Sequence, residues 1–237
     1  MDKKYIYANQ SSLWGEPECV GFGTDEFYVK EIDRKEANEI IIKNHYSKKV
    51  YNATYIHLGL FYKNEIKGVL QYGYAMNPAS CANVVKGTQK NEYLELNRMW
   101  ISDDCKQYAE SQAISYSIKY IKKKLKKIKW IQSFADERCG GFGIVYQACS
   151  FDYFGEHTSK FWELDGETFH NSIMTSEKAG PRGYKLLNNP DNKERVIQHK
   201  LRQFRYIKFI DKREKKNCLL KEMPYPKHYK EGVNKNG

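Results

Sequence analysis

Asp136 and Tyr146 stand at the two ends of a glycine-rich segment whose residue types could support catalysis. The segment SFADERCGGFGIVYQA begins at Ser133 and continues an apolar run from Trp130. It is typical of a strand, a loop and a helix. An acid at the carboxyl end of a buried strand can act as a general base or bind a metal, and it can equally cap the following turn. Both interpretations of Asp136 stay open here.

The glycines after Asp136 do not form a known phosphate-binding loop. Residues 140–143 read GGFG, whereas the dinucleotide fingerprint needs G-x-G-x-x-G near a first strand and a P-loop needs a lysine. Cys139 could be a nucleophile if it lay near His45, but no partner stands at a supporting spacing. Cys105 has still less support. We therefore take the glycines as a tight turn that brings the backbone close to a substrate.

Two other short segments combine titratable and hydrogen-bonding groups. NHYS places His45 next to the phenol Tyr46, which offers a base and a donor, although an ordinary surface histidine has the same pattern. ELNR, residues 95–98, is followed by SDD and by AES at a helix start, and such a helix N-terminus can bind an anion or a carbonyl oxygen. Arg98 could bind a phosphate or carboxylate there, or form a buried ion pair with a glutamate.

Hydrophobic periodicity predicts the elements that position these groups. Residues 1–30 are expected to be irregular, and the catalytic domain is expected to begin with an N-terminal extension. The predicted elements are a helix over 31–43, a hairpin of strands 55–62 and 66–74, a strand over 92–101, a helix over 109–128, a strand over 129–136, a short helix over 143–149, strand-like runs at 151–156 and 158–164, and a last strand over 202–210.

This order of elements predicts a mixed, twisted β-sheet with a parallel centre, flanked by helices in a single domain of α+β or α/β class. Period two in the strand over 92–101 places Tyr93, Glu95, Asn97 and Met99 on one face. We expect residues 1–187 to form the catalytic domain. Residues 188–237 should add a basic strand and tail that pack on or extend the same domain.

The charge of the chain favours a polyanionic partner. Lys and Arg number 40 against 29 Asp and Glu, which gives a net charge of +11, and there are 19 tyrosines. Nucleic acid is the first such partner to consider. The predicted last strand would lay Arg202, Arg205 and Lys208 along one surface. Lysines over 119–129 suit either a solvated helix face or a DNA-binding patch.

The remaining composition excludes several classes of protein. The six cysteines contain no CxxC pair, and they are too sparse for a disulfide scaffold. The first residues lack the apolar core of a signal peptide, and no run approaches the roughly 20 apolar residues of a membrane span. We expect a soluble protein of a reducing cytoplasm, with no membrane partner.

Five segments, taken in their order along the chain, resemble the Mom DNA-modification proteins of phage Mu and related phages. They are NHYSKK, LGLFYKNEIKGVLQYG, ELNRMWISDD, SFADERCGGFGIVYQACSFDYFGE and PYPK. The resemblance runs from Asn44 to Lys227. It implies an enzyme, working in the cytoplasm of a bacterial host, that converts adenine in DNA to its N6-carbamoylmethyl (acetamido) form and so protects the DNA from restriction. It also implies the fold of the acetyl-CoA-dependent GNAT acyltransferases, which agrees with the predicted elements.

Transferred position by position, the resemblance implies roles for particular residues. The implied catalytic residues are His45, Tyr46, Asp136 and Tyr146, and the implied donor-binding residues are Asn97, Arg98 and Ser111. From their charge we add Lys48, Lys49, Arg202 and Arg205 as DNA-binding residues. The sequence departs from the family at Gly141, where the pattern has a histidine, and in ISDDC, which lacks the Q/R-x-x-G-x-G/A of GNAT donor loops.

The chemistry of the implied product leaves the donor open. Acetyl transfer would give an amide, whereas a carbamoylmethyl group has one more nitrogen. A glycyl group has the right atoms but needs a rearrangement, so acetyl-CoA and aminoacyl-tRNA are both retained as donors. Iron bound by His45 and Asp136 is a further option without a third ligand in the pattern. The expected partner is double-stranded DNA with the adenine flipped onto a tyrosine or Trp100, with tRNA as a second partner if it is the donor; monomer and homodimer both stay open.

The adenine amine is a poor nucleophile because its lone pair is delocalised into the ring. The reaction therefore needs a base, for which we name Asp136 or His45, and donors for the carbonyl oxygen or leaving group, for which we name Tyr46 or Tyr146. Two rival functions remain: a GNAT acyltransferase acting on tRNA or a small amine, and a noncatalytic DNA-binding anti-restriction protein that uses only its basic surface.

Overall fold

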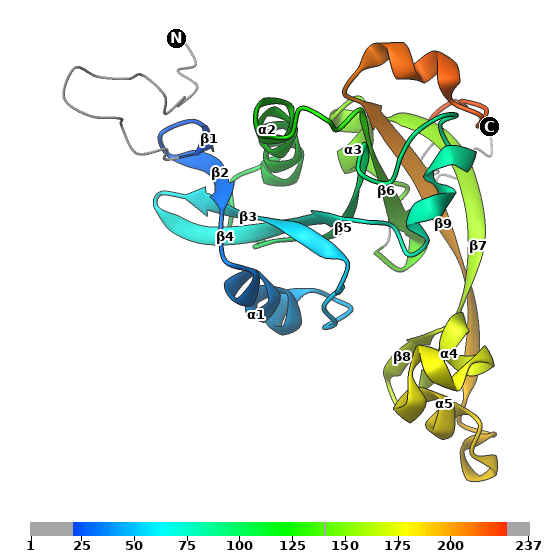
Figure 1. Cartoon of the computed structure of the whole chain (residues 1–237). Coiled ribbons are helices and arrows are strands. Elements are labelled where there is room, and N and C mark those ends of the chain that lie inside the picture. The colour runs from blue at the N-terminus through cyan, green and yellow to red at the C-terminus, as the bar shows by residue number, and fades with distance from the viewer. Residues whose placement is uncertain (1–20, 140, 227–237) are drawn as a thin grey trace, which may run out of the picture.

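The computed structural model describes residues 21–139 and 141–226, which form a nine-stranded sheet with helices on both faces (Figure 1). The strands are β1 (Phe22–Gly23), β2 (Phe27–Glu31), β3 (Thr54–Tyr62), β4 (Glu65–Gly73), β5 (Tyr93–Ile101), β6 (Trp130–Asp136), β7 (Asp152–Leu164), β8 (Glu167–His170) and β9 (Ile197–Phe209). The helices are α1 (Arg34–Asn44), α2 (Ala109–Lys124), α3 (Ile144–Ala148), α4 (Asn171–Thr175) and α5 (Pro181–Leu187), with short 3-10 turns between elements.

The strand order is β1-β2-β3-β4-β5-β6-β9-β7-β8. Only β5 and β6 run parallel, and they stand at the centre of the sheet, while the other neighbouring strands pair antiparallel. Helix α1 covers one face, and α2 and α3 cover the other (Figure 1). The predicted fold class, a mixed sheet with a parallel centre flanked by helices in one domain, is confirmed.

The elements with the strongest local patterns are those predicted. The β3–β4 hairpin turns at Lys63 and Asn64, whose φ angles of 52° and 66° match the two positive φ values of a tight hairpin turn. In α2 the isoleucine stripe is buried in the main core, as expected from its spacing. This helix ends at Lys124, earlier than predicted, because Leu125 leaves helical geometry and the chain turns back towards β6.

The prediction for the N-terminal part of the chain was wrong within the described residues. Phe27–Glu31 is a strand paired with β3, and Phe27 and Val29 are fully buried. Pairing with β3 therefore makes this segment a strand, although its own sequence shows no clear alternation of apolar and polar residues. The two strand-like runs after α3 are likewise one strand, β7, which continues through a register shift near Gly155, where φ is 84°.

A bulge in β5 changes the predicted alternation of that strand. Pairing with β4 shifts from Arg98 to Leu96, which leaves Asn97 as the extra residue. Beyond it, Met99 packs against the same core as Leu96, and Trp100 packs against the α1 side instead. The single face predicted for Tyr93 to Met99 is therefore wrong after Asn97, because the extra residue reverses the faces.

Strand β9 is inserted between β6 and β7. Its pairing with β6 has no irregularity, so successive side chains alternate between the two faces of the sheet. Arg202 and Lys208 share the face of the core residue Phe204, and Arg205 points to the opposite face. The prediction that these three cations lie along one surface was wrong. Arg205 is three residues from each of the other two, and an odd separation along a strand places side chains on opposite faces.

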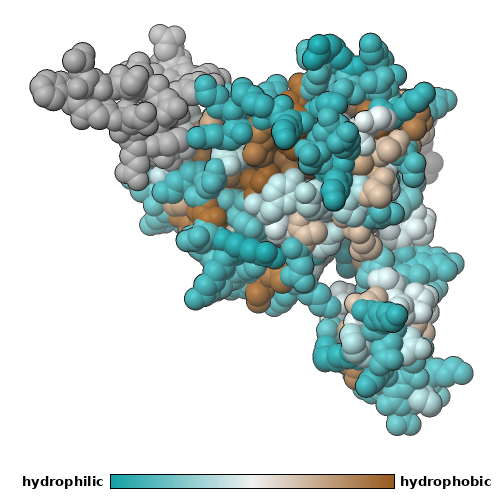
Figure 2. All heavy atoms as spheres, in the orientation of Figure 1, coloured by the Kyte–Doolittle hydropathy of each residue, from teal (hydrophilic) through white to brown (hydrophobic). Residues whose placement is uncertain are grey.

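The distal halves of β7 and β9, together with β8, α4 and α5, extend from the sheet as an arm, defined here as residues 159–200 (Figure 1). The arm has a small core of its own around Leu164, Phe169 and Leu187. Figure 2 shows the arm projecting from the body, with a hollow between the two and a hydrophilic outer end. The arm thus supplies one wall of a depression at the centre of the sheet.

Candidate functional site

The candidate functional site lies where the two parallel strands separate. β5 and β6 pair only over Tyr93–Glu95 and Trp130–Gln132. Beyond these residues the strands diverge, and two cavities lie at the gap. The arm-side cavity, of about 330 Å³, is lined by the body and the arm, and the α3-side cavity, of about 370 Å³, is lined by the glycine loop and α3. The two cavities share Tyr46, Leu96, Asn97, Arg98, Phe134 and Asp136, so they adjoin.

The structure brings together all but one of the residues predicted for catalysis and donor binding. Tyr46, Asp136, Asn97 and Arg98 line both cavities, and His45 and Tyr146 line the α3-side cavity. Ser111 lines neither. Its hydroxyl donates to the Tyr108 carbonyl at 3.1 Å in the first turn of α2, and its own carbonyl accepts from the Cys149 thiol.

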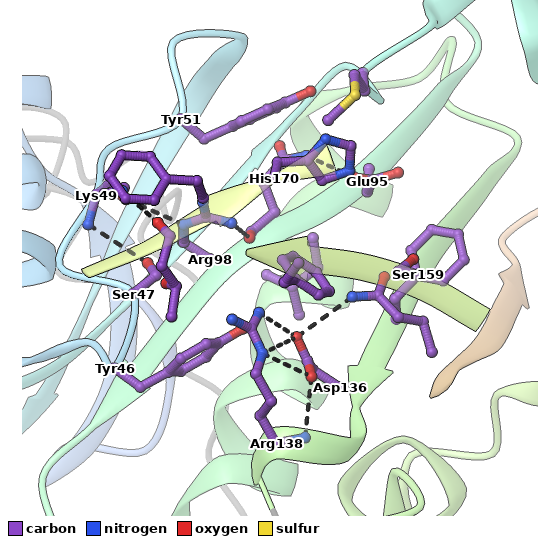
Figure 3. Close-up of a pocket in the computed structure, with 18 of the residues that line it drawn as sticks. Tyr46, Ser47, Lys49, Tyr51, Glu95, Arg98, Asp136, Arg138, Ser159 and His170 are labelled. Carbon is purple, nitrogen blue, oxygen red and sulfur yellow. Dashed lines mark hydrogen bonds and ion pairs between the residues drawn. The ribbon is translucent and has the colours of Figure 1, made fainter. Parts of the chain in front are cut away.

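Asp136 ends β6 at the junction of the cavities, and its carboxylate is heavily hydrogen-bonded (Figure 3). The Arg138 guanidinium donates to both carboxylate oxygens, with Nη2 2.5 Å from Oδ2, and the Arg138 backbone N–H donates to Oδ1 at 3.0 Å. Gln203 on β9 donates to Oδ2 at 3.3 Å. The turn-capping interpretation is thus correct for one oxygen, while the carboxylate still faces both cavities.

His45 follows α1 and is buried, with only 6% of its surface exposed. Its Nδ1 accepts the Ser47 backbone N–H at 3.1 Å and lies 2.8 Å from the Ser47 hydroxyl. Nδ1 is therefore unprotonated, and the neutral ring carries its proton on Nε2. Burial, and then the charges of Arg98 and Arg138, lower the pKa of His45 to about 4. At neutral pH this imidazole can donate a hydrogen bond from Nε2 but is a poor base.

The two phenols of the site are also kept protonated. Burial raises the pKa of Tyr146 to about 12, and its ring packs against Tyr206 and Phe151. Tyr46 is half exposed, but partial burial of its hydroxyl and the nearby Asp136 carboxylate raise its pKa even further. The same two causes raise the pKa of the Cys139 thiol, which disfavours the thiolate that a nucleophile needs. His45, Tyr46 and Tyr146 are therefore hydrogen-bond donors.

Arg98 does not form the glutamate ion pair that the sequence left open. Its guanidinium donates from Nη1 to the Asn97 carbonyl at 2.7 Å and from Nε to the Lys49 carbonyl at 3.2 Å. Within the part of the chain that the structure describes, no carboxylate lies within 4.0 Å of it. Its charge is therefore oriented at the junction of the cavities without a direct counter-ion.

Glu95 is a member of the site that sequence reasoning did not select. Its carboxylate accepts from Gln132 Nε2 at 2.7 Å and from Asn97 Nδ2 at 3.0 Å, and it lines the arm-side cavity. Burial raises its pKa to about 7, although both amides oppose the shift. Asn97 Oδ1 and Gln132 Oε1 beside it are buried without a protein partner. The signal in the sequence was an acid in a strand that also contributes to the core.

Glu95 and His45 should give the protein two opposite dependences of stability on pH. The folded protein keeps a proton on Glu95 between about pH 4.5 and 7, so its contribution to stability is lost as the pH rises. The folded protein excludes a proton from His45 between about pH 4 and 6.5, so that contribution is lost as the pH falls. Each shift corresponds to about 3 kcal/mol.

We predict that urea unfolding across this pH range will separate the two groups. For Glu95→Gln, the free energy of unfolding relative to the unmodified protein should rise by about 3 kcal/mol from pH 4.5 to 7. For His45→Gln, the relative value should fall by a similar amount from pH 4 to 6.5. Glu177→Gln, which removes an exposed pair on the arm, serves as the control. Parallel curves for all variants would contradict both assignments.

The lysines predicted to bind DNA differ in their surroundings. Lys48 is exposed, with a positive φ of 47°. Lys49 lines the arm-side cavity, where its Nζ donates to the Thr168 carbonyl at 2.7 Å and lies 4.9 Å from the Phe169 ring centroid. Lys49 thus connects the loop after α1 to the arm.

The two predicted arginines of β9 are already in contact with protein groups. Arg202 forms ion pairs with Glu137 at 2.8 Å and Glu156 at 3.6 Å. Arg205 stacks on Phe134, with 5.1 Å from its Cζ to the ring centroid, and its pKa is lowered by burial. A polyanion that binds either arginine would compete with these contacts.

The glycine loop is constrained at one glycine and open at another. Gly143 has a φ of 81°, and a Cβ there would meet Tyr206 at 2.4 Å, so the chain needs glycine at this position. At Gly141, which lines the α3-side cavity, a Cβ would meet only the Gly143 nitrogen at 3.9 Å. A side chain therefore fits where the resemblance led us to expect histidine. Gly140 lies outside the described residues.

The predicted iron ligands do not fit a metal in this arrangement. Among residues 21–139 and 141–226, no three or more His, Cys, Asp and Glu side chains are grouped to hold a metal ion. Nδ1 of His45 is taken up by Ser47, and Asp136 is paired with Arg138. No helix in the described part of the chain is long and apolar enough to span a membrane.

The family model of the Mom protein family matches residues 26–227 of this chain. The chain belongs to this family. The methylcarbamoylase Mom of Escherichia phage Mu is 47% identical over 216 residues, which cover 90% of this chain and 88% of the phage Mu protein. Membership of the Mom family confirms the resemblance that the ordered motifs indicated.

Two of the solved structures that are similar to this chain are acetyltransferases. The ribosomal-protein-S5-alanine acetyltransferase from Vibrio fischeri has a TM-score of 0.48 at 12% identity, covering 81% of this chain and 98% of its own. An acetyltransferase of the GNAT family from Streptococcus pneumoniae has a TM-score of 0.44 at 11% identity, covering 78% and 99%. These similarities concern the fold alone, and what this Mom family member does rests on its site.

Proposed function

We propose that this protein is a phage-type DNA-modification transferase that attaches a carbamoylmethyl group to the exocyclic amine of adenine and thereby protects DNA from restriction. The observation that carries the proposal is the pair of adjoining cavities with complementary chemistry. Groups that donate hydrogen bonds, His45 and Tyr146, line the α3-side cavity, while the carboxylate of Glu95 lines the arm-side cavity. Asp136 and Arg98 stand between them. The 47% identity to the phage Mu methylcarbamoylase supports the reaction class.

The arm-side cavity suits a base flipped out of the DNA stack. Aromatic rings from four segments line it: Tyr51, Phe134, Phe161 and Phe169. Aromatic side chains provide stacking surfaces for an extrahelical base. Trp100, a candidate for this role from its sequence position, packs on the α1 side of the sheet and does not line the cavity. Exposed Met76 stands at the mouth, since it lines the cavity with 67% of its surface free.

Asp136 is the group best suited to take the proton from the amine. It faces both cavities, whereas the base role of His45 is disfavoured by its occupied Nδ1 and its pKa of about 4. Glu95 is a second carboxylate, whose pKa of about 7 lets it hold or release a proton near neutral pH. The carboxylates of Asp136 and Glu95 would then accept hydrogen bonds from the adenine amine in the arm-side cavity as the amine loses its proton.

The α3-side cavity suits the carbonyl group of the donor. Three groups can donate hydrogen bonds to the carbonyl oxygen of the donor: Nε2 of His45, the Tyr146 hydroxyl and the Arg98 guanidinium. They can stabilise the negative charge that develops on this oxygen without gaining or losing a proton themselves. Glycines and apolar residues of the loop and α3 form the rest of the cavity. We retain aminoacyl-tRNA and acetyl-CoA as donors. Attack of the amine on the carbonyl of a glycyl ester would form an amide and release the tRNA hydroxyl, and a rearrangement would then give the carbamoylmethyl group, whereas acetyl-CoA would also need a source of the second nitrogen and an oxidant.

Nucleoside mass spectrometry of plasmid DNA from cells that express the protein tests the proposal. We expect a deoxyadenosine adduct with the mass of a carbamoylmethyl group, and resistance of that plasmid to restriction enzymes whose sites contain the adenine. Plasmid from cells expressing Asp136→Asn is the matched control. An unmodified deoxyadenosine pool together with modified tRNA or a modified small amine would favour the acyltransferase alternative, and no product at all would favour a noncatalytic DNA-binding protein.

A further inference from the structure

The Arg138 guanidinium lies in the arm-side cavity against two aromatic rings. Its Cζ is 4.1 Å from the centroid of the Phe161 ring and 5.2 Å from that of the Tyr46 ring. Tyr46 comes from the loop after α1, and Phe161 comes from β7, so different walls of the cavity supply the rings. A planar, delocalised guanidinium stacks on aromatic faces much as a nucleobase does.

The same guanidinium also covers the proposed base. Its Nε lies 3.0 Å from each oxygen of Asp136, and its Nη2 lies 2.5 Å from Oδ2 (Figure 3). While Arg138 stays in this position, an amine entering the cavity has to compete with it for the carboxylate. Two properties of a nucleobase, its flat face and its exocyclic donor, are therefore matched by one arginine side chain.

A second Asp-x-Arg pair shows that the rings are not needed to hold such an arginine. The Arg213 guanidinium and backbone N–H contact Asp211 with the same pattern of atoms, with Nη2 2.7 Å from Oδ2. The Arg213 side chain is 87% exposed, and no ring stacks on it among the described residues. The local turn alone thus explains the ion pair, so the two rings that stack on Arg138 are not required to hold it.

We propose that Tyr46 and Phe161 form the stacking site for the extrahelical purine, and that Arg138 holds this place until the purine enters. Entry of the base moves the guanidinium off both rings and off Asp136, whose carboxylate then accepts a hydrogen bond from the exocyclic amine. Base entry and exposure of the carboxylate are thereby one event. This inference rests on the proposed function and identifies the binding site of its substrate.

The test compares two single-stranded oligothymidylates, one with a central 2-aminopurine and one with an abasic tetrahydrofuran at the same position. The ratio of the abasic Kd to the 2-aminopurine Kd measures preference for the base, and quenching of 2-aminopurine fluorescence reports stacking. For Phe161→Leu we expect the ratio to fall about tenfold and the quenching to weaken, because one stacked ring is lost. For Arg138→Ala we expect the ratio to rise, since nothing has to be displaced. Arg213→Ala, the matched pair, should leave both unchanged.

Several outcomes would overturn the proposal. A protein without base preference, or a Phe161→Leu variant with the unmodified ratio and a normal thermal unfolding curve, excludes the stacking site. An Arg138→Ala variant whose ratio falls as in Phe161→Leu shows that Arg138 is a ligand contact and not a place-holder. If Phe161→Leu fails to fold, Tyr46→Leu gives the same measurement from the other wall.

The proposed function can fail separately. Base preference without any modified deoxyadenosine in plasmid DNA would leave a base-binding protein of another activity. Modified deoxyadenosine without base preference would keep the proposed function and exclude this stacking site.

Discussion

Replacing Asp136, the proposed general base, with asparagine should reduce the rate at which deoxyadenosine is modified by about a thousandfold or more. The amide keeps the shape of the carboxylate but cannot accept the proton of the adenine amine. It also turns an N–H group towards Arg138, which has no acceptor to offer. Single-turnover measurement of adduct formation gives the rate, and a gel-shift titration should show DNA affinity within about twofold of the unmodified protein, since no phosphate contact is removed.

The surface pair described above provides the control for this change. Asp211→Asn breaks the same kind of local contact with Arg213 far from both cavities, and its activity should be unchanged. Asp136→Asn that keeps more than a tenth of the rate would show that another group is the base. Glu95 would then be the first alternative, since its pKa of about 7 suits proton transfer at neutral pH.

Replacing Arg98 with alanine should lower the rate of the chemical step by about a hundredfold to a thousandfold, the typical effect of removing one donor from an oxyanion site. The guanidinium is oriented by the Asn97 and Lys49 carbonyls and has no direct counter-ion among the described residues, so its charge is available to a developing oxyanion. Arg98→Lys should recover part of the rate, because lysine restores the charge but not the fixed fork of donors. The loss should appear in kcat and in kcat/KM alike.

Arg195→Ala, which removes an exposed pair with Asp165 on the arm, is the control for loss of an arginine and should keep its rate. Because Arg98 also connects β5 to the loop after α1, thermal unfolding of Arg98→Ala has to be compared with that of the unmodified protein. A raised KM for the donor with an unchanged kcat would mean that Arg98 binds the donor equally in the ground and transition states, which contradicts an oxyanion role.

The parts of the fold that the sequence predicts are those that local patterns determine. The period of the isoleucines in α2 and the alternation around the Lys63–Asn64 turn each depend on neighbouring residues only. The bulge at Asn97 was missed because it is a property of two paired strands, and a single strand with period two gives no sign of it. The position of β9 likewise depends on partners about 70 residues away in sequence, such as the Asp136–Gln203 pair.

In the candidate site, too, the sequence predicted what short motifs determine and missed what depends on contacts between distant residues. The ordered motifs resemble one family, and that resemblance is enough to group His45, Tyr46, Asp136 and Tyr146 in a single site. The residue types alone left open whether Arg98 would pair with a glutamate and whether His45 would be a base. Both questions depend on contacts made in three dimensions, with the Lys49 carbonyl and the Ser47 backbone N–H. Glu95 was missed because burial, and not its neighbours in sequence, gives it an unusual pKa.

The insertion of β9 has a consequence for the order in which the site is assembled during synthesis. β6 is paired with β5 and β9 only, and β7 with β8 and β9 only, within the described strands, so the wall that holds Phe161 has no strand connection to Asp136 until β9 is in place. A ribosome-bound chain that has emerged only as far as residue 196 already contains every residue that lines the α3-side cavity, but it lacks Gln203 of the arm-side cavity and the strand that joins β7 to β6. Completion of the arm-side cavity therefore depends on long-range pairing with β9, which can form only late in synthesis.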